Sequence, residues 1–330
     1  MARYLGVDVG SVSTNLVLTN EKNEVVSSIY LLTEGEPIKA VQNGMSILKE
    51  EIGENTVIDG VGTTGSGRIL TGHMVGADVI HDEITAHGLA AAFAVPNVNT
   101  VLEIGGQDSK IIFIKDRVIV DFAMNSVCAA GTGSFLDHQA SRLKVPIEKF
   151  GELALKAATS CHIAGRCSVF AESDMIHKQQ LGYDKESIIY GLCQALVRNY
   201  LNNLAKGKKI GPVVIFQGGV AANAGMKRAF EESLGIEIII PKHYNVMGAL
   251  GMALYAKATA KEKGETNFKG FHISETEFLT RSFKCKGCEN QCEIVRIIEA
   301  GKTIAFYGGR CGKWETADAK LQETEEILTV

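Results

Sequence analysis

The chain has 330 residues, of which 45% are hydrophobic and 22% charged, and its formal net charge at pH 7 is −4. This composition excludes an intrinsically disordered, collagen-like or coiled-coil protein, and the length suggests roughly two domains. The small negative charge argues against broad nucleic-acid binding, because no domain-wide positive field is available to displace counterions.

No targeting or membrane segment is expected. The amino-terminal stretch reaches Asp8 before any long apolar run, so it does not resemble a secretory signal. No uncharged apolar stretch reaches the roughly 18 residues that a membrane span needs. We therefore expect a cytoplasmic protein with no membrane partner, in which the eight cysteines stay reduced and favour metal binding or redox chemistry over disulfides.

Residues 1–256 are predicted to form one α/β body, because apolar runs rich in β-branched residues alternate with helical patterns. Strands are predicted at 3–9, 14–19, 24–31, 57–61, 101–104, 110–114, 117–122, 213–216 and 236–240. Helices are predicted at 37–51, 83–93, 133–143, 147–157, 185–206, 223–234 and 246–259. A helix end or linker at 257–280, a cysteine-rich module at 281–315 and a polar tail at 316–330 follow.

A repeat within this body is visible when the sequence is shifted by 95 positions, which places Asp8-Val9-Gly10 on Glu103-Ile104-Gly105. Each copy has a strand, a glycine-containing turn, a second strand, a charged turn and a third strand. The repeat predicts two similar lobes, at about 1–95 and 96–256, that face a cleft.

The first glycine-containing turn has the composition of a phosphate-binding loop. Gly10 permits a sharp turn, after which the amides and hydroxyls of Ser11, Ser13 and Thr14 can face an anion. Asp8 is predicted at the end of a strand, where its carboxylate could hold a hydrated Mg²⁺.

The equivalent turn in the second copy has the same character. Gly105 and Gly106 allow close approach of the backbone to a phosphate. Asp108 is a second candidate ligand of Mg²⁺, and Gln107 could orient an attacking water. Either loop alone is weak support for nucleotide binding, but two repeat-related loops that each carry an acid make it the favoured hypothesis.

A third glycine pair follows the apolar run at 213–216. Gly218 and Gly219 would let a flat ring or a ribose lie against the backbone, and Asn223 is suited to cap the next helix. The chain has neither the Walker A pattern nor a dinucleotide-binding glycine motif after its first strand.

Together, DVGS, IGGQD and FQGGVAAN at these relative positions resemble the actin-like ATPase superfamily, which includes sugar kinases, actin and heat-shock ATPases. The resemblance implies two ribonuclease-H-like lobes with ATP between them.

Two cysteines precede predicted helices within the body. Cys128 comes before Gly131-Thr132-Gly133, a stretch that could also contact a phosphate, and Cys167 comes before a short helix. A thiolate is stabilised at a helix N-terminus. Two such cysteines cannot complete a four-thiolate site, but a symmetric dimer would supply four, enough for one [4Fe–4S] cluster.

The segments CAAGTGSFL and CSVFAES on this scaffold resemble the activators of 2-hydroxyacyl-CoA dehydratases and the related ATPase subunits of benzoyl-CoA reductase. The resemblance implies a homodimer with one [4Fe–4S] cluster held by Cys128 and Cys167 of each subunit. It also implies loading by ferredoxin or flavodoxin, and ATP-driven electron transfer into the iron–sulfur site of a partner enzyme. The stretch 83–87 is similar to one in this family as well, and we expect it to form a surface helix with no assigned role.

The C-terminal module carries four cysteines around a hairpin-like stretch at 293–307. Cys285, Cys288, Cys292 and Cys311 have the spacing of a four-cysteine metal site. Zinc and a second iron–sulfur cluster would use the same ligands, and zinc is slightly favoured because so short a segment needs a staple to fold. The shorter activators lack this module, so the acceptor could be a 2-hydroxyacyl-CoA dehydratase or a related reductase such as a double-cubane cluster protein.

Two other functions stay open at this point. A small-molecule kinase of the same fold would need a carboxylate base aimed at a substrate hydroxyl, and would need neither Cys128 nor Cys167. A non-redox ATP sensor or scaffold would bind ATP and use the C-terminal module to contact a partner.

Overall fold

The computed structural model describes residues 2–125 and 129–314. These residues form two compact units. The first contains 2–10, 14–81 and 252–314, and the second contains 11–13 and 82–251, apart from 126–128.

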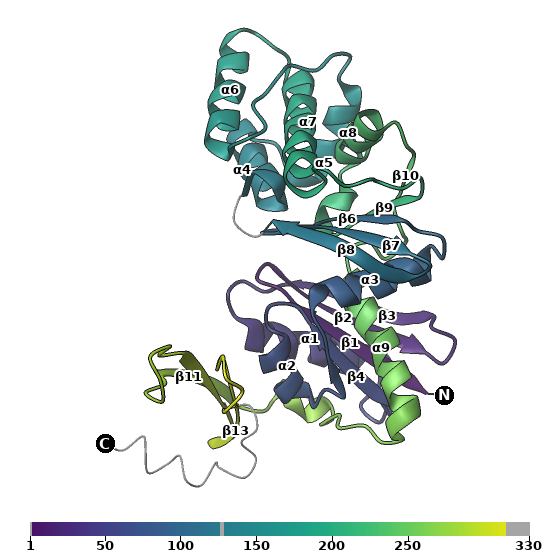
Figure 1. Cartoon of the computed structure of the whole chain (residues 1–330), viewed down its shortest axis with the longest axis vertical. Helices are drawn as coiled ribbons and strands as arrows, with labels where there is room; N and C mark the ends of the chain where they lie inside the picture. The colour runs from purple at the N-terminus through teal and green to yellow at the C-terminus, as the bar shows by residue number, and fades with distance from the viewer. Residues whose placement is uncertain (1, 126–128, 315–330) are drawn as a thin grey trace. The chain divides into compact units, whose positions relative to one another are not determined.

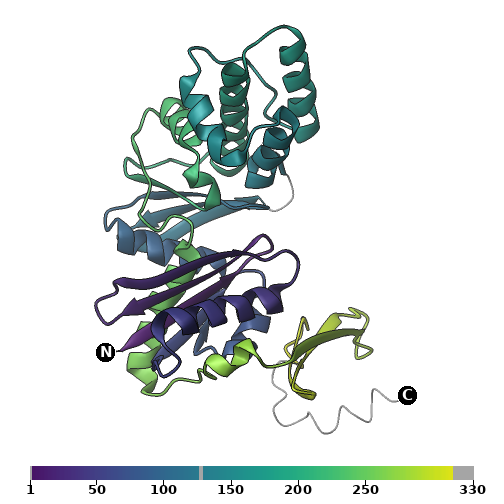
Figure 2. The ribbon, with the colours of Figure 1, turned by 180° about the vertical axis from the view of Figure 1, so that it is seen from behind.

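The first unit is built on a five-stranded sheet with the strand order β3-β2-β1-β4-β5. Its strands are β1 (Arg3–Val9), β2 (Ser13–Asn20), β3 (Val25–Leu32), β4 (Gly60–Thr64) and β5 (Val79–Ile80). The apolar side of α1 (Pro37–Ile52) lies across the sheet, and α2 (Arg68–Val75) packs beside it in the same hydrophobic core (Figure 2). On the other face, α9 (Met247–Lys263) lies so close that a Cβ on Gly62 would be 2.7 Å from the carbonyl oxygen of Met252.

The second unit repeats this topology with the strand order β8-β7-β6-β9-β10. Its strands are β6 (Thr100–Ile104), β7 (Ser109–Lys115), β8 (Val118–Asn125), β9 (Val214–Gln217) and β10 (Ile238–Ile239). In the first sheet, β1 pairs with β2 in antiparallel and with β4 in parallel. In the second sheet, β6 pairs with β7 in antiparallel and with β9 in parallel. The duplicated architecture predicted from the sequence repeat is therefore confirmed.

Helices cover both faces of the second sheet. The larger group lies on one side, as Figure 1 shows, and comprises α4 (Gly133–Leu143), α5 (Ile147–Lys156), α6 (Ser168–Gln180), α7 (Lys185–Leu204) and α8 (Ala224–Leu234). The opposite face is covered by α3 (Glu83–Ala94), whose Ala91 and Ala92 pack with Val101 and Ile112. Short 3-10 helices, η1 (Ala129–Gly131) and η2 (Gly219–Ala222), precede α4 and α8.

The unit boundaries differ from the sequence-based ranges in three places. Residues 11–13, predicted within the first lobe, belong to the second unit. Residues 82–95 belong to the second unit, because α3 packs on the second sheet. Residues 252–280, partly interpreted as a linker, are folded into the first unit: α9 runs to Lys263, and Phe271 and Ile273 in η3 (Phe271–Ser274) are buried in its core.

A three-stranded antiparallel sheet ends the described chain and contains the hairpin expected at 293–307. Its strands are β11 (Phe278–Lys284), β12 (Glu293–Glu299) and β13 (Lys302–Tyr307). Phe278 and Ile297 join the hydrophobic core of the first unit. Among the described residues, no helix is long and apolar enough to cross a membrane.

The aromatic core of the second unit provides a test of this packing. Phe230 is fully buried, with edge contacts to Tyr200 and Phe216 at ring-centroid distances of 5.4 and 5.2 Å. We expect Phe230→Ala to lower the free energy of unfolding by about 3–5 kcal/mol, because it leaves a cavity. Hydrogen exchange of amides in α7 and β9 measures this loss. Phe122→Ala is the control, since Phe122 is 52% exposed; equal effects of the two substitutions would contradict the described core.

Candidate functional site

The glycine-rich loops of the second unit pack directly on one another. A Cβ on Gly106 would lie 2.6 Å from Val12, the residue between Ser11 and Ser13 in the first predicted phosphate loop. The amide of Gly133 donates to the carbonyl oxygen of Gly105 at 2.8 Å. The first and second predicted loops are therefore joined to the start of α4, and only glycine at 106 permits the contact with Val12.

The third loop joins the same group. Gly218 has a positive φ of 88°, and a Cβ there would be 2.4 Å from the carbonyl oxygen of Ile104 and 2.7 Å from the carboxylate of Glu103. Gly219 is the first residue of η2. The next residue, Val220, packs on the start of α4, because a Cβ on Gly133 would lie 3.0 Å from its side chain. The structure thus brings Gly105, Gly106, Gly133, Gly218 and Gly219 of the predicted set into one region.

Asn223 and Thr132 both start helices. Asn223 caps α8 as predicted, because its side chain accepts a hydrogen bond from the amide of Met226 at 3.1 Å. Thr132 is the fully buried N-cap residue of α4. These positions hold the helix ends beside the glycine loops.

The first unit has its own group of polar loop residues around Asp8. Thr33 donates a hydrogen bond to the carbonyl oxygen of Gly10 at 2.9 Å, and its hydroxyl lies 3.0 Å from that of Thr14. Gly65, with a φ of 91°, approaches so closely that a Cβ there would be 2.7 Å from Oδ1 of Asp8. The predicted residues Asp8, Gly10 and Thr14 therefore lie near one another at the end of β1.

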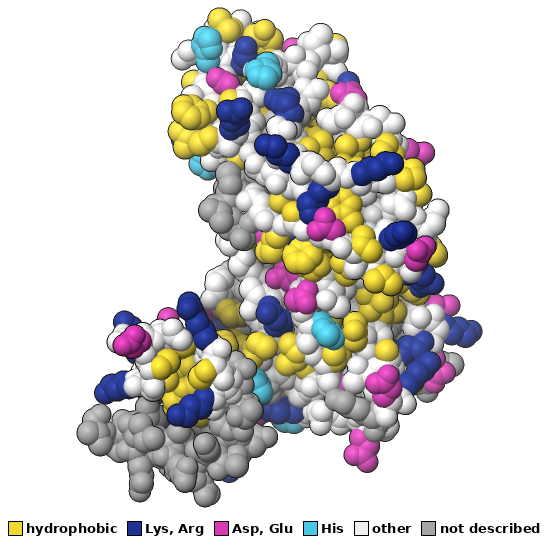
Figure 3. Space-filling model, in the orientation of Figure 1, with side chains coloured by type: hydrophobic (Ala, Val, Ile, Leu, Met, Phe, Trp, Pro, Cys, Tyr) yellow, Lys and Arg dark blue, Asp and Glu magenta, His cyan; other side chains and the backbone are white. Residues whose placement is uncertain are grey.

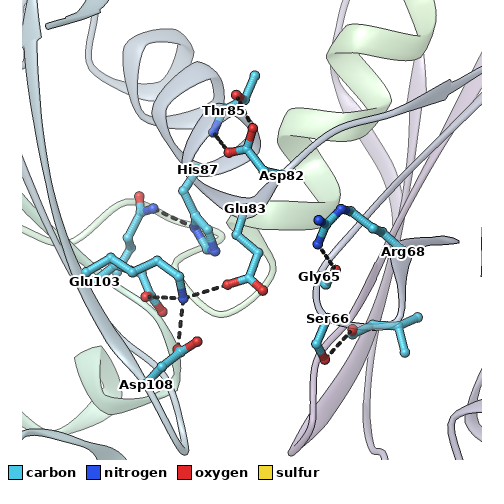
Figure 4. A network of polar contacts seen from close by, with 12 residues as sticks. Gly65, Ser66, Arg68, Asp82, Glu83, Thr85, His87, Glu103 and Asp108 are labelled. Carbon is cyan, nitrogen blue, oxygen red and sulfur yellow. Dashed lines mark hydrogen bonds and ion pairs between the residues drawn. The ribbon is translucent and has the colours of Figure 1, made fainter. Parts of the chain in front are cut away.

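The loop Gly65-Ser66-Gly67 was not singled out from the sequence. It follows β4, as Gly218 and Gly219 follow the equivalent strand β9 in the second unit. Arg68 donates to the carbonyl oxygen of Gly65 at 3.1 Å, and Ser66 donates to that of Val9 at 3.4 Å (Figure 4). The equivalence of the two turns is visible only in the sheet topology, because the 95-position shift does not align 65–67 with Gly218 and Gly219.

A buried lysine organises the acidic residues of the second unit. The ammonium group of Lys110 lies 2.7 Å from Glu83, 3.2 Å from Glu103 and 2.8 Å from Asp108 (Figure 4). The lysine and Glu103 are almost fully buried, whereas the side chains of Glu83 and Asp108 are 21% and 28% exposed. The cluster is therefore closed on the sheet side and partly open at the two outer carboxylates.

Burial and charge act against each other in this cluster. Burial alone would lower the pKa of Lys110, but its three carboxylate neighbours outweigh burial and raise that pKa. Burial raises the pKa of Glu103 to about 7, since it outweighs the opposing effect of Lys110, and the charges of Asp108 and Glu83 act in the same direction as burial. Glu103 is therefore a carboxyl group whose protonated form is favoured up to near neutral pH.

The helix that starts at Glu83 is not the surface helix expected from the sequence. His87, on its next turn, is buried, and its Nδ1 lies 2.8 Å from the side-chain nitrogen of Gln217. Burial lowers the pKa of His87 to about 3, with a further contribution from Lys110, so the imidazole is neutral. Gln217, Glu103 and Lys110 occupy adjacent positions on β9, β6 and β7, which places a row of polar side chains under α3.

Of the other predicted catalytic residues, Gln107 is exposed and Asp108 directly precedes β7. Asp108 is paired with Lys110, two residues further along the chain, an interaction that sequence reasoning missed. Gly131 belongs to η1, next to the start of α4.

Of the two predicted cluster ligands, Cys128 and Cys167, the structure describes only Cys167. Cys167 is the half-buried N-cap residue of α6, whereas Cys128 lies outside the described residues. Cys161 and Cys193 are buried in the core of the second unit. Cys167 therefore has the helix N-terminal position that the sequence indicated.

In the C-terminal module, the main chains of Cys285 and Cys292 contact each other. The amide of Cys285 donates to the carbonyl oxygen of Cys292 at 2.8 Å. Sγ of Cys285 accepts hydrogen bonds from the amide of Gly287 and the indole of Trp314, both at 3.4 Å, and these two bonds lower its pKa. Cys288 and Cys311 are exposed. Within residues 2–125 and 129–314, no three His, Cys, Asp or Glu side chains are placed to hold a metal ion, so the four-cysteine site stays a prediction.

The loops and acids together suit a phosphorylated ligand. Closely packed glycine turns and helix N-termini present amides to an anion, and carboxylates beside them suit a hydrated divalent cation. The family model for BadF/BadG/BcrA/BcrD ATPases matches residues 5–256. The chain belongs to this ATPase family.

Known members are similar to the chain over most of its length. The (R)-2-hydroxyglutaryl-CoA dehydratase activating ATPase of Acidaminococcus fermentans is 36% identical over 263 residues, which is 78% of this chain and 98% of that protein. The activator of lactoyl-CoA dehydratase from Anaerotignum propionicum is 35% identical over 78% of this chain and 99% of that protein. Residues 257–330 lie outside the range that the family model matches.

A solved structure supports the same assignment. The activator of the 2-hydroxyisocaproyl-CoA dehydratase from Clostridium difficile, determined with bound ADPNP, has a TM-score of 0.74 and 30% identity, covering 79% of this chain and 97% of that one. The two sheet-containing lobes predicted from the actin-like resemblance are therefore confirmed, and the protein is an ATPase.

The raised pKa of Glu103 predicts a pH dependence of stability. Because the folded pKa of about 7 exceeds the ordinary value of 4.5, the folded state holds a proton that the unfolded state loses between these pH values. The free energy of unfolding should therefore fall as pH rises through this range, by up to about 1.4 kcal/mol per pH unit from this group. Glu103→Gln should remove this contribution in urea titrations at several pH values.

Glu237→Gln is the control for this measurement, since Glu237 is an exposed glutamate of the same unit. It should leave the pH slope of the wild-type protein unchanged. A Glu103→Gln variant with the wild-type slope would show that Glu103 titrates normally.

Proposed function

We propose that this ATPase uses ATP hydrolysis to drive low-potential electron transfer into the iron–sulfur site of a partner 2-hydroxyacyl-CoA dehydratase or a related reductase. The observation that carries the proposal is the position of Cys167, a half-buried thiol at the N-terminus of α6 in the unit that also holds the converging glycine loops. The names of the relatives, which are activators of such dehydratases, support the same conclusion.

In this proposal, Cys128 and Cys167 of each of two subunits hold one [4Fe–4S] cluster, which would supply one-electron reducing capacity. The surroundings of Cys167 fit this role. It is the N-cap residue of a 13-residue helix, so it lies at the end of α6 where main-chain amides are left without helical partners. Val169 and Phe170, in the first turn of this helix, are each 66% exposed, an apolar surface that a second subunit would cover. Figure 3 shows exposed hydrophobic side chains in the region of the molecule where Figure 1 labels α6.

The nucleotide would be bound by the glycine-containing loops predicted from the sequence. Ser11, Ser13, Thr14, Gly106, Gly131 and Thr132 would contact the phosphates, and Gly218 and Gly219 would flank the nucleoside. Asp8 and Asp108 would hold Mg²⁺ through water, and the exposed Gln107 would orient the attacking water. Lys110 keeps Asp108 in place and offsets part of the negative charge beside the phosphates.

Partners follow from the same chemistry. Ferredoxin or flavodoxin would deliver the electron to a homodimer in the cytoplasm. The acceptor would be an iron–sulfur dehydratase, or alternatively a reductase of the double-cubane cluster type. Nucleotide binding would bias the dimer towards the state that docks with this acceptor.

We propose that Cys285, Cys288, Cys292 and Cys311 hold a structural Zn²⁺, with a second iron–sulfur cluster as the alternative. The hydrogen bonds from Gly287 and Trp314 to Sγ of Cys285 favour its thiolate, the form that binds metal. The main-chain bond between Cys285 and Cys292 holds the ends of the first three-cysteine segment together.

Iron content tests the electron-transfer proposal. Protein purified without oxygen should contain a shared cluster equal to about two irons per chain, visible by absorption and EPR, in a dimer. Changing Cys128 and Cys167 together to Ser should remove this iron and the activation of a partner dehydratase while ATP binding is retained. Cys193→Ala is the control, because that buried thiol lies in the core. ATP binding without iron, even after anaerobic reconstitution, would reject electron transfer and favour a kinase.

Metal analysis of the same sample tests the C-terminal module. About one zinc per chain supports the structural site, whereas about six irons per chain would show a second cluster there. Changing the two exposed cysteines, Cys288 and Cys311, to Ser should release the module's metal and leave the dimer-bridging iron unchanged. Full metal content in this variant would contradict the assigned ligands.

A further inference from the structure

One helix of the second unit contacts both the nucleotide-binding side and the segment before Cys167. Three successive residues of α7 make side-chain hydrogen bonds to main-chain oxygens in different parts of the unit. Arg198 donates to Ile163 at 2.5 Å, Asn199 to Gly165 at 2.6 Å, and the hydroxyl of Tyr200 to Lys110 at 2.5 Å. Because α7 is a 20-residue helix with most of its residues buried, these three contacts are carried by one rigid element.

The segment 163–166, which leads into Cys167, is held mainly by α7. A Cβ on Gly165 would be 2.8 Å from the carbonyl oxygen of Ala195, so the segment lies directly on the helix. The amide of Ala164 also donates to Asp174 of α6 at 2.8 Å. Any shift of α7 therefore moves the main chain immediately before Cys167.

Asn199 lies between this segment and the loop at Gly131. Its side chain is 3% exposed, and its amide nitrogen donates to the carbonyl oxygens of Gly165 and, at 3.4 Å, Arg166. Its amide oxygen accepts from Asn203 at 3.0 Å and faces Gly131, where a Cβ would be only 2.9 Å away. One buried amide thus contacts a loop on each side.

The side facing Gly131 is connected to the candidate phosphate loops. Two residues after Gly131, the amide of Gly133 donates to Gly105, and the next amide, that of Ser134, donates to Gly106 at 2.8 Å. Tyr200 provides a second route, because it binds the main chain of Lys110, whose ammonium group holds Asp108. A change in these loops on nucleotide binding would therefore act on Asn199 and Tyr200 together.

We propose that Asn199 is a positioning residue that transmits the nucleotide state of the phosphate loops to Cys167. A buried amide group loses free energy if it gives up a hydrogen-bond partner, so Asn199 stays bound to the carbonyl groups of Gly165 and Arg166. Its amide oxygen packs closely against Gly131, so a shift of that loop pushes on Asn199 and through it on the segment before Cys167. This inference rests on the proposed function, in which Cys167 is a cluster ligand, and it names the residue through which nucleotide would alter that ligand.

The test uses the full-length protein without cluster, in which Cys167 is a free thiol. The alkylation rate of Cys167 by iodoacetamide is followed by mass spectrometry of the peptide that contains it, with saturating Mg-ADP or a non-hydrolysable Mg-ATP analogue. The Kd of each nucleotide is measured first for every variant, so that saturation is assured. In the wild-type protein the two nucleotides should give rates that differ by about fivefold or more, the lower end of typical coupling between sites.

Asn199→Asp is the decisive variant, because it retains the size of the side chain and an oxygen facing Gly131 but loses the amide that donates to Gly165. It should bring the two alkylation rates together. Asn199→Ser serves the same purpose if the aspartate variant does not fold, and Asn202→Ala, an exposed asparagine of the same helix, should behave as wild type. With cluster loaded, the EPR spectrum should likewise lose its difference between the two nucleotides in Asn199→Asp.

The result that overturns the inference is a wild-type difference in alkylation that persists in the folded Asn199 variants. A wild-type protein in which both nucleotides give the same rate overturns it as well. Failure of the proposed function is recognised separately, by the absence of iron from the wild-type protein after anaerobic reconstitution, because alkylation of Cys167 does not depend on a bound cluster.

Discussion

The ammonium group of Lys110 fixes the geometry on which the candidate site depends. Removing a lysine from water is costly, and here the cost is offset by carboxylates from α3, from β6 and from the loop before β7. The three segments are therefore tied to one point. Glu103, one of these partners, lies directly beneath Gly218, so the space for a side chain at 218 is already occupied. The charge cluster and the glycine loops are thus parts of a single packing arrangement.

Much of the fold could be predicted because its determinants are local. Runs of β-branched residues such as those of β6 and β7 mark buried strands whatever surrounds them, and the 95-position shift relates two copies of the same strand–turn–strand pattern. Glycines soon after a strand, as at Gly106 and Gly218, mark close approaches that other residues would block. The candidate loops were therefore recognisable before it was known that they pack together.

The remaining features depend on contacts between distant parts of the chain. In the sequence, Lys110 is one polar residue within a strand, and only pairing with Glu103 and burial under α3 reveal its partners. The range 257–280 resembles a linker because it begins with a charged stretch, most of which lies within α9. Phe271 and Ile273 in the same range are nevertheless buried, and Gln42 of α1 donates to the carbonyl oxygen of Ile273 at 3.1 Å. Its order comes from a partner more than two hundred residues away, which periodicity cannot show.

The C-terminal sheet is stabilised by packing at both of its ends. The expectation that so short a module needs a metal to fold therefore does not apply to the sheet itself. At one end, Phe278 and Ile297 are buried in the core of the first unit, so the sheet is stabilised by the body of the protein. At the other end, Trp314 packs on Phe283 and Phe306 with ring centroids 5.2 and 5.3 Å apart and donates to Cys285. The metal proposed for this module would therefore have to order only the loops that carry the cysteines. Because the sheet shares its core with β1, the cysteine loops are anchored to the same compact unit as Asp8.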